Sequence, residues 1–233
     1  ADGVAQTLLD HGLGRQDKVA QLLYNGPEYL ETMFGAFKVS MVPVNTNYRY
    51  TIEELCYLWD NSDARAVVFH ASLSDRCAAV RAQLPAIRAW ICVDDGTEAC
   101  PNWAVPYEDA TASSTTRATA PWLRDGDDLY LLYTGGTTGM PKGVMWQQRE
   151  LFSMFETLAG RAEFIARTDP IGYVEAITKR GPRVVPAAPL MHGTAAFYTM
   201  PVLSQAGSVI TVERRSFDAV HVLDVLDRER VNG

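Results

Sequence analysis

The chain has 233 residues, of which 47% are hydrophobic and 21% charged, and its 21 basic and 28 acidic side chains give a formal net charge of −7. An acidic chain has no overall attraction for nucleic acid or an anionic membrane, so any anion that it binds must be held by local geometry. No stretch reaches the roughly 18 consecutive apolar residues of a membrane span, and the first residues lack the pattern of a signal peptide. We therefore expect a cytoplasmic protein with no nucleic-acid partner and no integral membrane segment.

Short apolar runs recur along the first half of the chain and alternate with amphipathic segments. The runs cover residues 19–24, 41–45, 66–70 and 89–93. They are continuous in hydrophobicity, which is typical of strands in a parallel sheet with helices on both faces. The sequence therefore predicts an α/β fold with parallel sheets flanked by helices.

Three helices are predicted between these strands. Pro27 favours a helix start, because its missing N–H costs nothing there, and Thr51 with Glu54 forms a capping box for the second helix. The apolar residues expected to form one buried face of the first helix are Leu30, Met33, Phe34 and Phe37. The corresponding residues of the second helix are Ile52, Leu55 and Trp59, and those of the third are Leu73, Cys77, Val80 and Leu84.

The four cysteines are predicted to be reduced thiols that act as small core residues. They form no C-x-x-C pair, and no histidine stands at metal-ligand spacing from any of them. Free cysteine is common in protein cores and in reducing compartments. We predict no protein-bound metal set from Cys56, Cys77, Cys92 and Cys100.

Hydrophobic periodicity fades between residues 94 and 128, where the stretch TASSTTRATAP is small and polar. A surface connection is expected there, and a linker between lobes near residues 95–128 is one interpretation. Strands are predicted at residues 129–134 and 142–146. The elements expected after them are a helix from residue 150 to about residue 166, an extended segment at 183–193, a buried helix ending near residue 203 and a strand at 208–212. A last helix, capped by Ser216, is expected to carry Phe217, Val220, Leu223 and Leu226 on one side.

Residues 133–146, YTGGTTGMPKGVMW, hold four glycines, three threonines and one lysine between two apolar runs. Unshielded backbone N–H groups in such a loop can form a concave nest for an anion, and threonine hydroxyls and Lys142 suit a polyphosphate. A Walker-type loop would need Gly-Lys followed by Ser or Thr at a helix start, whereas Pro141 pushes Met140 into extended geometry. We therefore predict a strand–loop–strand flap. A glycine-rich turn without a ligand is the alternative.

Within this stretch, TGGTTGMPKG resembles the signature loop of the adenylate-forming superfamily, which contains acyl-CoA synthetases, adenylation domains of peptide synthetases and firefly-type luciferases. The usual pattern is T-S-G-T-T-G-x-P-K-G, and Gly135 replaces its serine, which puts one hydroxyl contact to phosphate in doubt. Residues 42–55 and PLMHG at residues 189–193 resemble two further family segments, the second lying beside the acyl pocket. The chain looks most like ligases for fatty or steroid-type carboxylates. Residues 1–233 would then be the N-terminal portion of the AMP-binding domain.

The resemblance implies that ATP and Mg²⁺ activate a carboxylic acid to acyl-AMP and that coenzyme A then takes the acyl group. Catalysis would be mainly alignment and charge neutralisation. The residues that the resemblance assigns to the phosphates are Thr134, Gly135, Gly136, Thr137, Thr138, Gly139 and Lys142, with catalytic roles for Thr137 and Lys142. His192 and Gly193 would lie beside the carboxylate end of the acyl group, and the alternative for His192 is a histidine bonded to backbone. The apolar residues Ala195, Ala196 and Phe197 are expected to be ordinary core residues, and the alternative is that they line the acyl pocket.

Several family motifs do not occur in these residues: the Y-G-x-T-E segment, a later aspartate motif, the hinge and the C-terminal lid with its lysine. We therefore expect the chain by itself to be inactive and to be part of something longer. The alternatives are an adenylation domain that loads a carrier protein, a luciferase-like enzyme, and a truncated nucleotide-binding module without catalysis. A phosphate-loop NTPase is disfavoured by Pro141, and a homodimer is left open.

Overall fold

The computed structural model of the protein describes residues 1–136, 139–160, 170–212 and 214–233. They fall into two compact units, Ala1–Gln147 and Gln148–Gly233. The division lies where the last strand of a large sheet passes directly into a helix. No helix within the described ranges has the length and apolar character needed to cross a membrane.

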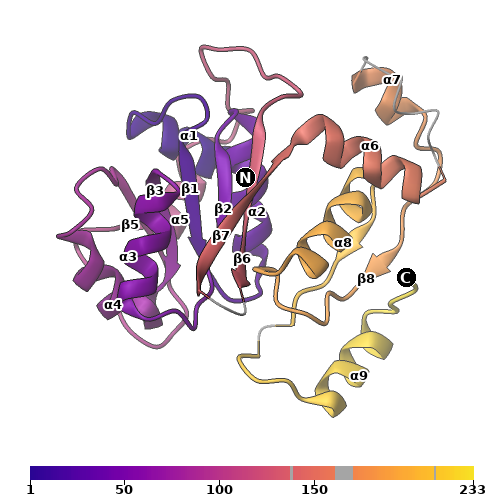
Figure 1. Cartoon of the computed structure of the whole chain (residues 1–233). Coiled ribbons are helices and arrows are strands. Elements are labelled where there is room, and N and C mark those ends of the chain that lie inside the picture. The colour runs from indigo at the N-terminus through magenta and orange to yellow at the C-terminus, as the bar shows by residue number, and fades with distance from the viewer. Residues whose placement is uncertain (137–138, 161–169, 213) are drawn as a thin grey trace. The chain divides into compact units, whose positions relative to one another are not determined.

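A seven-stranded sheet forms the centre of the first unit (Figure 1). Its strands are β1 (Lys18–Leu22), β2 (Val42–Asn45), β3 (Ala64–His70), β4 (Ala89–Val93), β5 (Val105–Pro106), β6 (Leu129–Gly136) and β7 (Gly139–Gln147). Their spatial order is β5-β4-β3-β1-β2-β6-β7. Neighbouring strands run parallel except β6 and β7, which pair antiparallel as a hairpin at one edge. The predicted α/β class and the four predicted strands of the first half are confirmed.

Helices cover both faces of this sheet. Ala20 and Leu22 of β1 belong to the same buried cluster as side chains of α3 (Ile52–Asn61) and α4 (Ser74–Arg81), so these two helices lie on one face. The short turn η1 (Ala71–Leu73) precedes α4. The intervening Gln21 donates from its side-chain amide to the Tyr29 carbonyl, at 2.7 Å. Because successive strand residues point to opposite faces, Tyr29 and its helix lie on the other face. The helices associated there by mutual contact are α1 (Asp2–Asp10), α2 (Pro27–Lys38) and α5 (Tyr107–Ala112).

Both predicted helix starts are confirmed. Pro27 is the first residue of α2. At α3, the Glu54 backbone N–H donates to the Thr51 hydroxyl at 3.3 Å, and the Thr51 backbone N–H donates to the Glu54 carboxylate at 2.8 Å. The reciprocal pair satisfies two of the N–H groups that a helix start leaves without helical partners.

The buried face of α2 differs from the prediction. Of the four expected residues only Met33 is buried, and the face that packs inward consists of Tyr29, Thr32, Met33, Gly35 and Ala36. A Cβ on Gly35 would stand 2.9 Å from the Ala1 carbonyl oxygen. Close contact with α1 therefore selects the small residues of α2, and the bulky phenylalanines lie at the margin.

Residues 95–128, expected to be a surface connection, with a linker between lobes as one interpretation, carry β5 and α5, which belong to the first unit. The Thr7 hydroxyl donates to the Ala110 carbonyl at 3.1 Å, and the Ser113 hydroxyl donates to the Gly3 carbonyl at 2.7 Å. These bonds tie α5 to α1. The division between the two units follows Gln147 instead.

The second unit is mainly helical. Its elements are α6 (Gln148–Leu158), α7 (Pro170–Glu175), β8 (Arg183–Val184), α8 (Gly193–Ser204), β9 (Ser208–Val209) and α9 (Ala219–Arg228), and β8 pairs parallel with β9. The helix expected at 150–166 is confirmed as α6, which ends at Leu158; residues 161–166 of that prediction lie outside the described residues. Only two residues of the predicted strand at 208–212 join a ladder.

The expected start of the last helix was wrong. Asp218 is the N-cap of α9, and its carboxylate accepts from the His221 backbone N–H at 3.1 Å. The expected apolar side was also wrong, because Val225 is the buried residue of this helix. The predicted residues that are exposed instead are Phe217, Val220 and Leu223.

Candidate functional site

The glycine- and threonine-rich stretch is the tip of the β6–β7 hairpin. Thr134 pairs with Lys142, and Gly136 pairs with Gly139. The predicted strand–loop–strand geometry is confirmed, and Lys142 lies within a strand, unlike the lysine of a Walker-type loop. Thr137 and Thr138, which complete the predicted loop, lie outside the described residues.

Thr134 and Lys142 project from the same face of the hairpin, because directly opposed residues of an antiparallel pair share a face. Both are exposed. Among the described residues, no carboxylate lies within ion-pair distance of the Lys142 ammonium. The hairpin thus presents one hydroxyl and one uncompensated cation side by side, which is a donor set suited to phosphate oxygens.

The backbone near the tip is open. A Cβ added to Gly135 or to Gly139 would meet nothing within 4 Å. The packing of the described residues therefore does not require glycine at these positions. Approach of a ligand to the bare backbone is a physical reason for glycine there, as it is in phosphate-binding loops generally.

Two asparagines brace the base of the hairpin, and sequence reasoning missed both. The Asn45 side-chain amide donates to the Tyr133 carbonyl at 2.9 Å, and its oxygen accepts from the Tyr133 backbone N–H at 2.6 Å. The Tyr133 hydroxyl donates to the Asn61 side-chain oxygen at 2.7 Å. Asn45 is the last residue of β2. A side-chain amide at the end of a buried strand is the sequence feature that could have identified it.

Tyr133 is set firmly into the first unit. Its side chain belongs to the main buried cluster and is only 6% exposed. Burial, followed by the nearby Tyr57 and Asp63, raises the pKa of Tyr133 to about 12. A Cβ on Gly143, its cross-strand neighbour, would stand 2.9 Å from the Tyr133 ring. The ring therefore occupies the space that the glycine leaves.

His192 and Gly193 lie in the second unit, at the start of α8. His192 is the N-cap residue, with an exposed side chain that makes no cap hydrogen bond. Its carbonyl accepts from the Ala195 and Ala196 backbone N–H groups, each at 3.1 Å. The exposed imidazole is available to a ligand. Ala195 and Ala196 are buried, as expected for core residues.

The described residues contain no cluster of three or more histidine, cysteine or acidic side chains that could hold a metal ion. Mg²⁺ bound to a nucleotide does not need one, since phosphate oxygens and water supply most of its ligands. All four cysteines are free thiols, and Cys77 and Cys92 are buried. Burial raises the pKa of the Cys77 thiol, which keeps it protonated and unreactive.

The AMP-binding enzyme family matches residues 1–233 of the chain. The chain is similar to the medium-chain acyl-CoA ligase Mig of Mycobacterium avium, with 37% identity over 97% of this chain and 41% of that protein. It is also similar to a 3-oxocholest-4-en-26-oate–CoA ligase of Rhodococcus rhodochrous, with 33% identity over 100% of this chain and 42% of that protein. The chain thus spans about two fifths of the length of these relatives.

Solved structures show the same fold. ATP-bound MatB from Rhodopseudomonas palustris matches with a TM-score of 0.75 and 26% identity over 97% of this chain and 41% of that chain. The N-terminal domain of FACL13 from Mycobacterium tuberculosis matches with a TM-score of 0.72 and 24% identity over 99% of this chain and 52% of that chain. The second likeness concerns the fold alone.

Proposed function

The chain belongs to the AMP-binding enzyme family, and from that premise we propose that it supplies the phosphate-binding hairpin of an enzyme that activates a carboxylic acid with ATP. The carboxylate oxygen attacks the α-phosphate, the bond from the α-phosphate to the bridging oxygen breaks, and acyl-AMP and pyrophosphate form. The thiol of coenzyme A then attacks the acyl carbon and expels AMP. The overall product is an acyl-CoA.

The observation that carries the proposal is the pairing of Thr134 with Lys142 across an exposed, glycine-rich hairpin. Carboxylate and triphosphate are both anions, so their approach requires positive charge and backbone donors around the phosphates. Lys142 supplies the charge. The stretch from Thr134 to Gly139 supplies hydroxyls and N–H groups to the β- and γ-phosphates. Within it we propose Thr137 as the hydroxyl that, with Lys142, acts on the reacting triphosphate.

A hairpin suits this reaction because the phosphates must be both held and released. The bracing of Tyr133 by Asn45 fixes the base of the hairpin, while a Cβ added at Gly135 or Gly139 near the tip would meet nothing within 4 Å. We propose that the tip closes over the triphosphate and opens to release pyrophosphate. Such closure aligns the reactants and excludes water.

For the acid, we propose a fatty or steroid-type acyl group, with His192 and Gly193 near its carboxylate end. The names of the relatives support this, since one is a medium-chain acyl-CoA ligase and another acts on 3-oxocholest-4-en-26-oate. The exposed imidazole of His192, which makes no cap hydrogen bond, can donate to a carboxylate oxygen. Mg²⁺ would be held mainly by the phosphates and would neutralise their charge. A cytoplasmic location and a homodimer stay predictions.

The test is carboxylate-dependent exchange of pyrophosphate into ATP, measured on the intact protein that the gene encodes. Decanoate and a steroid acid with its carboxylate at carbon 26 serve as substrates. Lys142→Ala is compared with Lys179→Ala, a matched change of another exposed lysine. We expect exchange that depends on the acid and falls at least tenfold in Lys142→Ala alone. No acid-dependent exchange by the wild type would refute the proposal. Replacing coenzyme A by a carrier protein in the second step separates a CoA ligase from a carrier-loading domain.

A further inference from the structure

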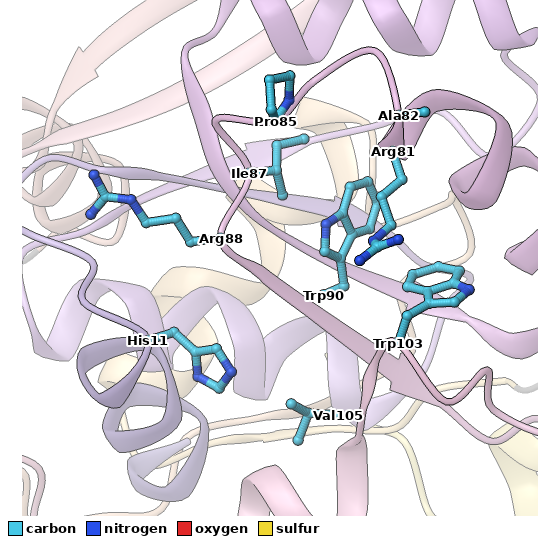
Figure 2. A pocket seen from close by; sticks show the side chains of 9 residues that line it. All are labelled: His11, Arg81, Ala82, Pro85, Ile87, Arg88, Trp90, Trp103 and Val105. Atoms are coloured by element: carbon cyan, nitrogen blue, oxygen red, sulfur yellow. The ribbon is translucent and has the colours of Figure 1, made fainter.

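A cavity of about 380 Å³ opens in the first unit at the sheet edge opposite to the hairpin. Its walls come from the residue after α1, from α4 and the turn that follows it, and from β4 and β5 (Figure 2). The lining residues are His11, Arg81, Ala82, Pro85, Ile87, Arg88, Trp90, Trp103 and Val105. β3, β1 and β2 lie between β4 and the β6–β7 hairpin, so the cavity is separate from the phosphate-binding residues.

The polar lining of the cavity is basic. Arg81, Arg88 and His11 are among the lining residues, and none of the nine is acidic. Among the described residues, no carboxylate lies within ion-pair distance of either guanidinium. Arg88 is anchored by donation to the Gly12 carbonyl at 2.8 Å. In a chain with a net charge of −7, this local excess of positive charge favours an anion.

The other two basic groups, Arg81 and His11, are also held in fixed positions. The Arg81 guanidinium carbon lies 5.3 Å from the centroid of the Trp103 ring, and Figure 2 shows the two side chains next to each other. The His11 Nδ1 atom bonds the Thr7 carbonyl at 2.8 Å. Because a carbonyl can only accept, Nδ1 carries the proton, and Nε2 is the ring atom left for another contact.

The apolar wall is aromatic and rigid. The rings of Trp90 and Trp103 stand at 89° to each other with centroids 5.7 Å apart. Trp103 is stacked on Phe69 with an interplanar angle of 17°, and Trp90 also meets Trp59 edge-on. Trp90 and Phe69 belong to the main buried cluster. The wall is therefore formed before any ligand arrives, and it places two indole rings beside a cation.

From this combination we propose that the cavity binds a small organic anion with a planar apolar body, such as an aromatic carboxylate. The carboxylate pairs with Arg81, and the ring packs against Trp90 and Trp103. The volume is near the lower end for small-molecule sites, about 300–1,000 Å³, which fits a ligand of one or two fused rings. The proposal does not depend on ATP-dependent acid activation.

The probe is 1-naphthoate, titrated into the 233-residue chain labelled with 5-fluorotryptophan. The five tryptophans give separate ¹⁹F signals, which single Trp→Phe variants assign. We expect saturable shifts of the Trp90 and Trp103 signals, with Trp122 and Trp146 unmoved. The neutral isostere 1-naphthamide should bind at least tenfold more weakly. Arg81→Gln should weaken naphthoate at least tenfold, while Arg117→Gln, at an exposed arginine outside the cavity, should leave binding unchanged.

Each opposite result overturns the proposal. Naphthamide binding as tightly as naphthoate would show that charge plays no part. An unchanged affinity in Arg81→Gln would remove the assigned partner, and unmoved Trp103 signals would place the ligand elsewhere. Inorganic phosphate that displaces naphthoate at equal concentration would identify a site for simple anions. The dispersed signals of the remaining tryptophans in Arg81→Gln report that the variant is folded.

Discussion

Asn45 and Tyr133 are joined by two hydrogen bonds. The Asn45 side-chain amide donates to the Tyr133 carbonyl at 2.9 Å, and its oxygen accepts from the Tyr133 backbone N–H at 2.6 Å. The amide copies the pattern of a neighbouring strand at the point where β2 ends and β6 continues toward the hairpin tip. The ladder between β2 and β6 pairs Val44 with Leu131. The side chain of Asn45 therefore extends the strand pairing up to Thr134, the first of the proposed phosphate-binding residues.

Asn45→Ala is expected to destabilise the chain by about 2–6 kcal/mol, because it leaves two buried backbone groups unsatisfied at about 1–3 kcal/mol each. Urea unfolding followed by tryptophan fluorescence measures the change. Asn102→Ala, at an exposed asparagine, should change stability by less than about 0.5 kcal/mol. Equal effects of the two substitutions would contradict the bracing role of Asn45.

Substitution by alanine should affect the stability of the chain differently at two glycines of the hairpin. At Gly143 the added Cβ would meet Tyr133 at 2.9 Å and Leu131 at 3.0 Å, so Gly143→Ala should cost about 1–3 kcal/mol through overpacking. At Gly135 it would meet nothing within 4 Å, so the free energy of unfolding should stay within about 0.5 kcal/mol of the wild type. Thermal unfolding of the two variants checks this, and a destabilised Gly135→Ala would show that the tip is packed.

Alkaline pH should weaken the fold partly through Tyr133. Its pKa is raised to about 12 by burial, against about 10 in an unfolded chain. The neutral form is thus favoured by folding, so this stabilisation is complete below pH 10 and is lost as the pH rises toward 12. Tyr133→Phe should flatten the fall of stability across that window, whereas Tyr198→Phe, at a residue 43% exposed, should not. A pH profile of urea midpoints tests the contrast, and identical profiles for both variants would count against it.

Long periodic or strongly apolar segments were predictable from the sequence, and short or tightly packed ones were not. The strand at residues 129–134 and the cap at Thr51 follow from local residue chemistry that no distant contact overrides. The buried face of α2 depends on how closely α1 approaches Gly35, which is tertiary information. β5 has two residues and α5 has six, too few for a period to show.

The candidate site divides in the same way. The loop motif identified Thr134, Gly135, Gly136, Gly139 and Lys142 as one group, and the hairpin does bring them together. Asn45 and Asn61 both contact Tyr133, from which they are separated in sequence by 88 and 72 positions, respectively. Nothing local in the sequence predicts these contacts. At α9, Ser216 and Asp218 are both good cap residues, and only the backbone geometry selects Asp218.

The central claim is that the β6–β7 hairpin grips the phosphates of ATP through Lys142, and isothermal titration of ATP into the 233-residue chain tests it most directly. A charge-assisted hydrogen bond contributes about 1.5–3 kcal/mol, so Lys142→Ala should raise the Kd for ATP by about 10- to 150-fold. Lys179→Ala should leave the Kd unchanged. If Lys142→Ala binds ATP as tightly as the wild-type chain does, the hairpin is not the phosphate site and the account fails.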